Sequence, residues 1–360
     1  MRWDDLPQVL SPAGRTLSEL LEPGPSRQKL PGYEPVYRDF VDYIVRCTHR
    51  IWEQKNVGLC RSHYAADCAI HTLAGPVTGV DCVVQNTVST LAATPDRLLI
   101  GEDVIWSDDG PNGAGRDLYS SHRIVSRSTH MGDDPLLGEA TFVSNGVMTI
   151  ADCLCRENRI VEEWLVRDNL RGVFQVGGDP WTVAQAQAAA DSEGDQFRHQ
   201  WRKDWVAATR ESGDVDIPAD HPAERPAAML AAALRDDLFG EAAVALSPAC
   251  EVRWPSNRHG WGRGYWVGCC TQIKGALHNT VLRVEHVAAR PLPEGDVAVA
   301  LRWALAGTHL GNGLWGKATG RDVLISAVSH YRLREGAIME DTTVFDELAV
   351  LRQVCGGLGA

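Results

Sequence analysis

An internal repeat constrains the fold of this chain more than any other feature of its sequence. When the chain is aligned with itself at a shift of 178 residues, segment 138–176 falls on segment 316–354, and 12 of these 39 positions are identical. Unrelated segments of average composition would agree at roughly two or three positions. With one residue of slippage, Thr129–Gly132 also falls on Thr308–Gly311. The sequence therefore predicts two copies of one unit of about 140 residues.

The repeat divides the chain into four segments. We expect an N-terminal extension at 1–32, a first domain at 33–177, a helical segment and linker at 178–225, and a second domain at 226–355. The linker assignment depends on an Ala- and Gln-rich stretch that is followed by polar and Pro-containing residues, a composition typical of a helix and a loop.

Each unit has the pattern of helices followed by strands. Apolar residues recur at spacings of three and four over 40–51 and 229–238, which predicts helices. Hairpin turns are predicted at 156–159 and 334–337, because Asn158 and Gly336 occupy the same place and both tolerate a positive φ. The predicted fold class is α+β, with a curved, mostly antiparallel sheet around N-terminal helices in each unit.

The strand after each hairpin turn carries the clearest pattern. Between 159 and 170, every position that is identical in the two copies has an even number. Alternate residues of a strand share a face. We therefore expect one face, which includes Glu162, Trp164 and Asp168, to pack under the helices or to line a cavity. An acid on such a face needs a partner or a raised pKa.

Composition excludes several classes of protein. The net charge is −12 with no Lys/Arg block, which disfavours a nucleic-acid partner. No apolar run approaches 18 residues, so no membrane-spanning helix is expected. The N-terminus lacks the apolar run of a signal peptide, and the ten cysteines include no Cys-x-x-Cys pair. We expect reduced cysteines, no metal site and a cytoplasmic location. The 12 tryptophans outnumber the 6 phenylalanines, an excess that cores, interfaces and ligand pockets would all explain.

A series of motifs gives the chain a family resemblance. They are Tyr64–His71, Arg123, Thr129-His130-x-Gly132 and Ile160-x-Glu162-x-Trp164-x-x-x-Asp168, with counterparts in the second unit that end in Ile338-x-Glu340 and Asp346. This pattern resembles the SnoaL-like polyketide cyclase (ester cyclase) family of the nuclear-transport-factor-2-like superfamily. The resemblance implies two cone-shaped domains in tandem, each a curved sheet wrapped around helices, which pair through their sheets as an intramolecular pseudo-dimer. A homodimer of whole chains is left open.

The resemblance also implies a site. In such cyclases an Asp near the end of the last strand acts as acid and base in an aldol ring closure. Catalytic roles would then fall to Asp168, His130, Arg123, Asp346 and His309. Substrate contacts are expected from a wider set: Tyr64, His71, Trp106, Trp164, Trp254, Trp261 and Arg302. The second unit departs from the pattern, because Thr342 replaces Trp164.

Two functional hypotheses follow from these residues. The first is a cofactor-free acid/base enzyme of lyase, isomerase or cyclase type that acts on a small, mostly apolar carbonyl or hydroxyl substrate, with Asp168 as base and His130 or Arg123 as donor. The second is a non-catalytic ligand-binding or assembly module with a degenerate second copy. Whether Asp168 and His130 point into the same cavity distinguishes the two.

Overall fold

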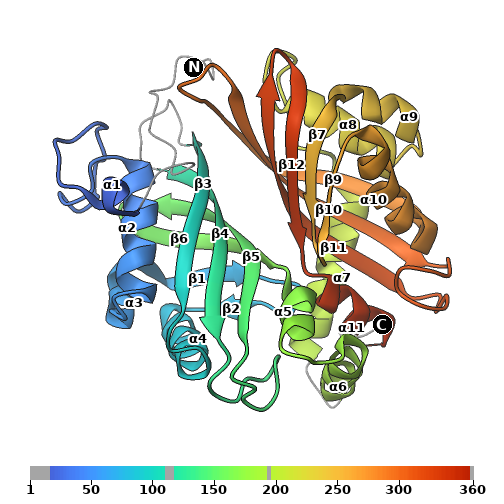
Figure 1. Ribbon diagram of the computed structural model, residues 1–360, viewed down its shortest axis with the longest axis horizontal. Coiled ribbons are helices and arrows are strands. Elements are labelled where there is room, and N and C mark those ends of the chain that lie inside the picture. Colours follow the sequence, from blue (N-terminus) through green and yellow to red (C-terminus); the bar gives the residue numbers. More distant parts are fainter. Residues whose placement is uncertain (1–16, 110–116, 193–195, 357–360) are drawn as a thin grey trace.

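The protein consists of two sheets with helices against them. The computed structural model describes residues 17–109, 117–192 and 196–356. The first part of the chain forms one half of the molecule and the last part forms the other (Figure 1). This arrangement confirms the predicted tandem of two α+β domains. Residues 1–16 of the expected N-terminal extension lie outside the described residues.

The two sheets share one strand order. The first is formed, from edge to edge, by β2 (Val77–Thr78), β1 (Tyr64–His71), β6 (Arg159–Arg167), β5 (Ser144–Arg156), β4 (Asp117–Thr129) and β3 (Leu98–Asp108). The second is formed by β8 (Arg258–Trp261), β7 (Leu246–Trp254), β12 (Ala337–Phe345), β11 (Asp322–Arg334), β10 (Val297–His309) and β9 (Leu277–Pro291). In each sheet only the pair β1–β6 or β7–β12 is parallel. The repeat in sequence is thus a repeat in topology.

Helices cover the inner face of each sheet. In the first domain they are α1 (Leu17–Leu21), α2 (Phe40–Trp52), α3 (Cys60–His63), α4 (Val80–Ala93) and α5 (Asn169–Gln175), with a 3-10 turn at Val57–Leu59. In the second they are α8 (Glu224–Leu234), α9 (Phe239–Ala242), α10 (Arg263–Ala276) and α11 (Glu347–Val354), with a 3-10 turn at Ala243–Ala245. The helices α4 and α10 both begin after a glycine with positive φ, Gly79 and Gly262. A residue with a Cβ resists this conformation, so the same local requirement persists in both copies.

The predicted helical linker forms two helices, α6 (Pro180–Ser192) and α7 (Gln196–Glu211). Both pack on the second domain: α6 lies against α11, and α7 places Val206 among Ala304 and Ala306 of the second sheet. The boundaries at residues 177 and 226 remain predictions.

Aromatic residues fill the two interiors differently. The core of the second domain contains Trp266, Trp303 and Trp315, each at most 1% exposed. In the first domain Trp106 packs edge-on against Phe40 and is 2% exposed. The Trp106 ring is therefore part of the core, and its expected contact with substrate stays a prediction. Core packing therefore explains much of the excess of tryptophan over phenylalanine.

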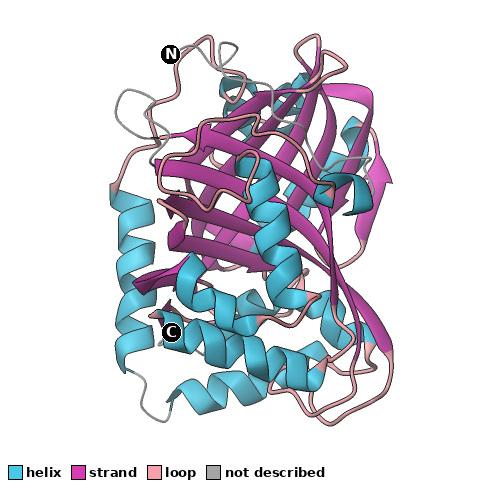
Figure 2. Cartoon of the chain, turned by 90° about the vertical axis from the view of Figure 1, so that its left-hand side faces the viewer, coloured by secondary structure: helices cyan, strands magenta, loops and turns pink. Residues whose placement is uncertain are grey.

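The outer faces of the two sheets pack against each other. Ile150 and Val166 of the first sheet form one apolar cluster with Val328 and Val344 of the second. Figure 2 shows the strands of the two sheets one behind the other, with helices around them. This is the intramolecular pairing through sheets that the tandem predicts.

A buried arginine lies in the middle of this sheet contact. Arg302 is 6% exposed, forms ion pairs with Glu285 at 3.1 Å and Asp152 at 3.6 Å, and donates a hydrogen bond to Tyr119. Its guanidinium also lies 3.5 Å from the centroid of the Trp164 ring. Burying a charge is costly unless it is paired, so these partners stabilise the ionised side chain between the sheets.

A β-bulge changes which residues of β6 face inward. Ile160 pairs with Cys155 but Glu162 pairs with Leu154, so Val161 is the extra residue. The same bulge recurs in β12 at Met339. A bulge shifts the alternation of side chains by one residue. Ile160 therefore faces the helices, whereas Glu162 and the residues two and four positions later face the second domain. The even-numbered residues therefore do not all share one face, because the bulge places Ile160 on the face opposite to that of Glu162 and Val166.

The sheet contact predicts a large cost for Arg302→Met. Removing one partner of a buried charged network leaves the others uncompensated, so we expect a loss of about 3–5 kcal/mol in the free energy of unfolding. Chemical denaturation of the whole chain measures it. Arg156→Met is the matched control, since its pair with Asp117 is 53% exposed at the arginine and is worth about 1 kcal/mol or less. Equal losses in the two variants would contradict this role of Arg302.

Candidate functional site

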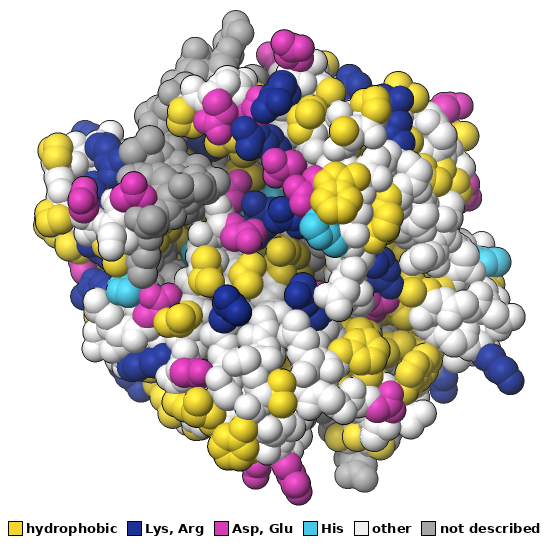
Figure 3. All heavy atoms as spheres, in the orientation of Figure 1, with side chains coloured by type: hydrophobic (Ala, Val, Ile, Leu, Met, Phe, Trp, Pro, Cys, Tyr) yellow, Lys and Arg dark blue, Asp and Glu magenta, His cyan; other side chains and the backbone are white. Residues whose placement is uncertain are grey.

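A cavity opens where the two domains meet. Its volume is about 180 Å³. Its lining comes from both domains: Met148, Asp168 and Arg171 from the first, and Arg253, Trp254, Pro255, Asn257, Arg258, His259, Thr343 and Val344 from the second. Basic side chains gather near a hollow at this junction (Figure 3). Neither domain alone supplies this set of residues.

Asp168 is the buried acid of the cavity. It follows β6 and caps the N-terminus of α5, where its carboxylate accepts a hydrogen bond from the backbone N–H of Arg171 at 3.4 Å. It also accepts one from the backbone N–H of Ser256 in the second domain at 2.9 Å. The side chain is 3% exposed. Burial raises its pKa to about 6, against the opposing effect of the two N–H donors.

The opposite wall is the β7–β8 hairpin of the second domain. Three residues, 255–257, join the two strands, and Ser256 and Asn257 among them have positive φ, 62° and 63°. Arg253 and His259, on the two strands, both contact Glu251 at 2.8 Å. The turn brings the Ser256 N–H against the first domain, so the hairpin closes the cavity.

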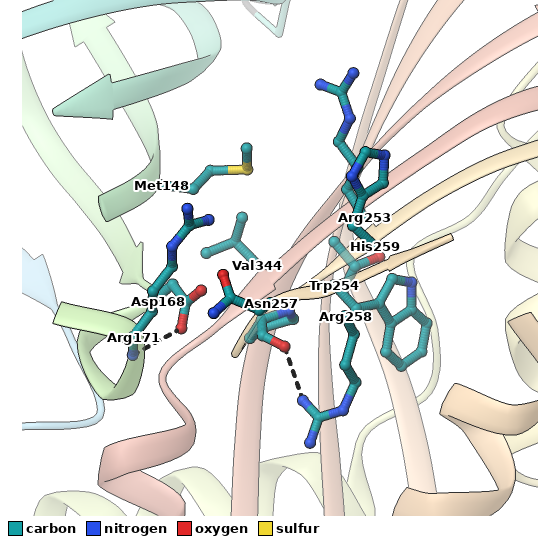
Figure 4. A pocket seen from close by; sticks show the side chains of 11 residues that line it. Met148, Asp168, Arg171, Arg253, Trp254, Asn257, Arg258, His259 and Val344 are labelled. Atoms are coloured by element: carbon teal, nitrogen blue, oxygen red, sulfur yellow. Dashed lines mark hydrogen bonds between the residues drawn. The ribbon is translucent and has the colours of Figure 1, made fainter. Parts of the chain in front are cut away.

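Two further arginines line the cavity in different ways. Arg258 is held by Glu347 through two hydrogen bonds of 2.8 Å and by the carbonyl of Pro255. The Arg171 side chain lies beside Asp168 and Met148, across from Arg253 (Figure 4). Its Nε atom is buried and has no hydrogen-bond partner.

The two motif histidines are not part of this cavity. His130 Nδ1 lies 3.1 Å from Thr141 Oγ1, and His309 Nδ1 lies 3.1 Å from Thr319 Oγ1. Both histidines are fully buried, His130 directly after β4 and His309 as the last residue of β10, and neither lines the cavity with Asp168. The structure does not bring Asp168 and His130 together, because each histidine is bonded to a threonine of its own domain.

Two predicted residues of the first sheet, Arg123 and His71, lie on its outer face. Arg123 donates a hydrogen bond of 2.7 Å to Thr342 of the second domain and pairs with Glu102. His71 stacks on Trp164 and bonds Glu162 at 2.9 Å. Arg123, like Arg302, connects the two domains, whereas these partners of His71 belong to its own domain. The roles expected for Arg123 and His71 stay predictions, and neither residue lines the cavity.

Asp346 is the counterpart of Asp168 at the start of α11. It accepts hydrogen bonds from the backbone N–H of Ala349 at 3.1 Å and from Asn169 of the first domain. Burial raises its pKa to about 6. Asp346 is not among the residues that line the cavity, so the two copies are not equivalent there.

Each cone contains a buried acid that does not belong to the even-numbered positions identical in the two copies. Glu163 in the first domain is 5% exposed and accepts a hydrogen bond from Tyr64 at 3.2 Å, and burial raises its pKa. Asp341, the residue 178 positions later, accepts hydrogen bonds from the indoles of Trp254 at 3.1 Å and Trp266 at 2.8 Å. The sequence did contain the signal, an acid at the same position of both copies, but Glu and Asp do not count as identical.

The two remaining predicted tryptophans differ in exposure. Trp254 is 4% exposed, and it both bonds Asp341 and lines the cavity. Trp261 ends β8 and is 64% exposed next to His259. Only the first of them is positioned to meet a molecule in the cavity.

Among the described residues, neither a metal site nor a membrane-spanning helix is found. Among them, no group of three or more His, Cys, Asp and Glu side chains is arranged to hold a metal ion. No helix within the described ranges is long and apolar enough to cross a membrane.

Comparison with known families finds a similarity in the second domain. Residues 241–354 match the model of the family described as SnoaL-like polyketide cyclase. This match confirms the resemblance predicted from the motifs, and the first domain has the same strand order as the second. No curated protein matches the chain.

Solved structures of single domains also resemble the chain. IdmH from Streptomyces antibioticus, a candidate polyketide cyclase, is 23% identical, with 37% of this chain and 97% of that chain covered and a TM-score of 0.32. AclR from Streptomyces galilaeus, a candidate hydroxylase, is 26% identical, with coverages of 37% and 96% and a TM-score of 0.31. TsrD from Streptomyces laurentii is 16% identical, with coverages of 39% and 99% and a TM-score of 0.32.

The indole donors of Asp341 predict a pH-dependent effect of Trp266→Phe. A hydrogen bond to a charged group contributes about 1.5–3 kcal/mol. Burial holds the pKa of Asp341 at about 6, so this contribution is present above pH 6 and is lost as the pH falls through 6 and the carboxyl becomes neutral. Denaturation at pH 8 and pH 4.5 measures it.

Trp303→Phe is the matched control for this measurement. The Trp303 ring is equally buried, but its indole donates to the neutral hydroxyl of Ser329 at 2.9 Å. We expect a loss of about 1 kcal/mol at both pH values, beyond any packing change. A loss in Trp266→Phe that is the same at pH 8 and at pH 4.5 would contradict a charged Asp341.

Proposed function

We propose that the protein is a cofactor-free acid/base enzyme, of the cyclase or isomerase type that its fold suggests, and that its active site is the cavity between the domains. The observation that supports this most is Asp168, a buried carboxylate with a pKa of about 6 that lines the cavity. A general base works best when its pKa lies near the working pH. The substrate is a small carbonyl compound whose apolar part lies near Met148 and Val344.

The proposed reaction begins with removal of a proton. Asp168 accepts a proton from the carbon next to a carbonyl group, and the electron pair of that C–H bond moves to the carbonyl oxygen to form an enolate. Arg171 donates hydrogen bonds to this oxygen, which lowers the energy of the charge as it forms. In a cyclase, the enolate carbon then attacks a second carbonyl carbon of the same molecule, the C=O electron pair moves to that oxygen, and the resulting alkoxide takes the proton from Asp168. In an isomerase, where a C=C bond is conjugated with the enolate, Asp168 returns the proton to a different carbon and the first carbonyl forms again.

The competing function is a ligand-binding or assembly module. Two observations favour it. Asp168 and His130 do not line the same cavity, and both carboxylate oxygens of Asp168 already accept backbone N–H groups, one from each domain. In this case Asp168 would only cap α5 and hold the β7–β8 hairpin in place. A carboxylate oxygen has two lone pairs, so the same bonds are also compatible with proton transfer.

Exchange of carbon-bound protons with D₂O tests the enzyme without a known product. The probes are levulinate, methyl levulinate, pyruvate and cyclohexanone, each followed by proton NMR. We expect the wild-type protein to catalyse exchange in at least one probe and Asp168→Asn to reduce that rate by about 100-fold or more, the usual contribution of a general base. The rate with wild type should rise through about pH 6, as Asp168 loses its proton.

Glu163→Gln is the control for the location of the site, because Glu163 is the buried acid of the first cone. We expect this variant to keep the wild-type exchange rate. Loss of exchange in Glu163→Gln but not in Asp168→Asn would place the base in the cone and overturn the proposal. Exchange of none of the probes by the wild-type protein would favour the binding module.

A further inference from the structure

The basic side chains of the cavity differ in whether they have a partner. On the second-domain wall, Arg253 and His259 share Glu251, and Arg258 forms two hydrogen bonds with Glu347. The charges of these groups are therefore compensated within their own domain. Such pairs fix the shape of the wall but have little charge left for a ligand.

Arg171 is the exception among these lining residues. Within the part of the chain that the structure describes, no carboxylate forms an ion pair with its guanidinium, and its buried Nε–H has no hydrogen-bond partner. Leaving a buried donor unsatisfied costs about 1–3 kcal/mol. The nearest acid on its own element, Asp168, accepts the backbone N–H of Arg171 rather than the guanidinium. Among the described residues, the buried Nε–H of this side chain thus has no acceptor.

The position of the guanidinium suggests what that acceptor is. Arg171 and Asp168 line the same cavity from the first domain, with the Met148 side chain beside them (Figure 4). A molecule that fills the cavity meets, next to the proposed base, a cation that forms no ion-pair contact with the described carboxylates. A carboxylate matches the planar, bidentate donor pattern of a guanidinium.

We infer that the substrate is an organic anion, a carbonyl compound with a carboxylate group that pairs with the Arg171 guanidinium. This inference rests on the proposed function only for the role of Asp168; the binding of the anion itself does not require catalysis. It narrows the substrate from a neutral, mostly apolar carbonyl compound to a keto acid. Pairing with the ligand would also satisfy the buried Nε–H of Arg171.

A matched pair of probes tests the inference by binding alone. Levulinate and methyl levulinate share the ketone and differ in the charge of the acid group. We expect the intact wild-type protein to bind levulinate at least about 10-fold more tightly than the ester, as a charge-assisted hydrogen bond predicts. Ligand-detected NMR titration at fixed salt measures both. Equal affinities, or no binding of levulinate, would overturn the inference.

Variants assign the preference to Arg171. Arg171→Met should remove the preference for levulinate, whereas Arg171→Lys should keep part of it, since an ammonium retains the charge. Arg127→Met is the matched control, because Arg127 is exposed on β4 and does not line the cavity. A preference that persists in Arg171→Met at wild-type size would assign the anion to another residue and contradict the inference.

Asp168→Asn separates this inference from the proposed function. We expect Asp168→Asn to bind levulinate at least as tightly as the wild type, since it removes a negative charge next to the anion, while it loses proton exchange. Binding without exchange in the wild-type protein would leave the anion site standing and overturn only the enzyme. Proton exchange by the wild-type protein, without a preference for levulinate over its methyl ester, would overturn the anion site and leave the proposed enzyme standing.

Discussion

The contact between the outer faces of the two sheets is the constraint on which the rest of the structure depends. At its centre Arg302 carries a charge that water cannot reach, and Glu285 and Asp152 compensate it from the two domains. Its guanidinium also lies over the Trp164 ring, which attracts the charge and fixes the orientation of the side chain. A paired buried charge adds little net stability but penalises every arrangement in which the pairs fail to meet. The network therefore selects one register between the sheets.

That register creates the cavity. Asp168 reaches its second donor, the N–H of Ser256, only when the β7–β8 hairpin lies against the first domain. The hairpin turn needs two residues with positive φ, Ser256 and Asn257. A single cone of this fold would leave Asp168 at the end of a strand, next to the start of α5. Duplication thus gave this residue a new environment at a boundary that one domain does not have.

Much of the architecture could be predicted from the sequence, and its limits have a definite cause. The repeat, the early helices and the hairpin turns depend on local patterns, and the strand order bears out the tandem. The direction in which the β6 side chains point could not be predicted. The prediction assumed that side chains alternate without a break, and the extra residue Val161 interrupts this alternation. An extra residue in one strand leaves no mark in its own sequence; it is visible only in the pairing. The cavity could not be predicted either, since its walls come from segments about 90 residues apart, such as Asp168 and Arg258.

The environment of Asp168 combines two opposing requirements on a base. Burial raises its pKa, while the donors from Arg171 and Ser256 lower it, and the result of about 6 leaves the carboxylate ionised at neutral pH. A dry cavity without those donors would favour a neutral acid that accepts no proton. An exposed carboxylate would be ionised but too weak a base. A ligand anion on Arg171 would weaken the opposing positive charge and exclude water, so both effects would raise the pKa of Asp168 further. Substrate binding and basicity are then coupled through one arginine.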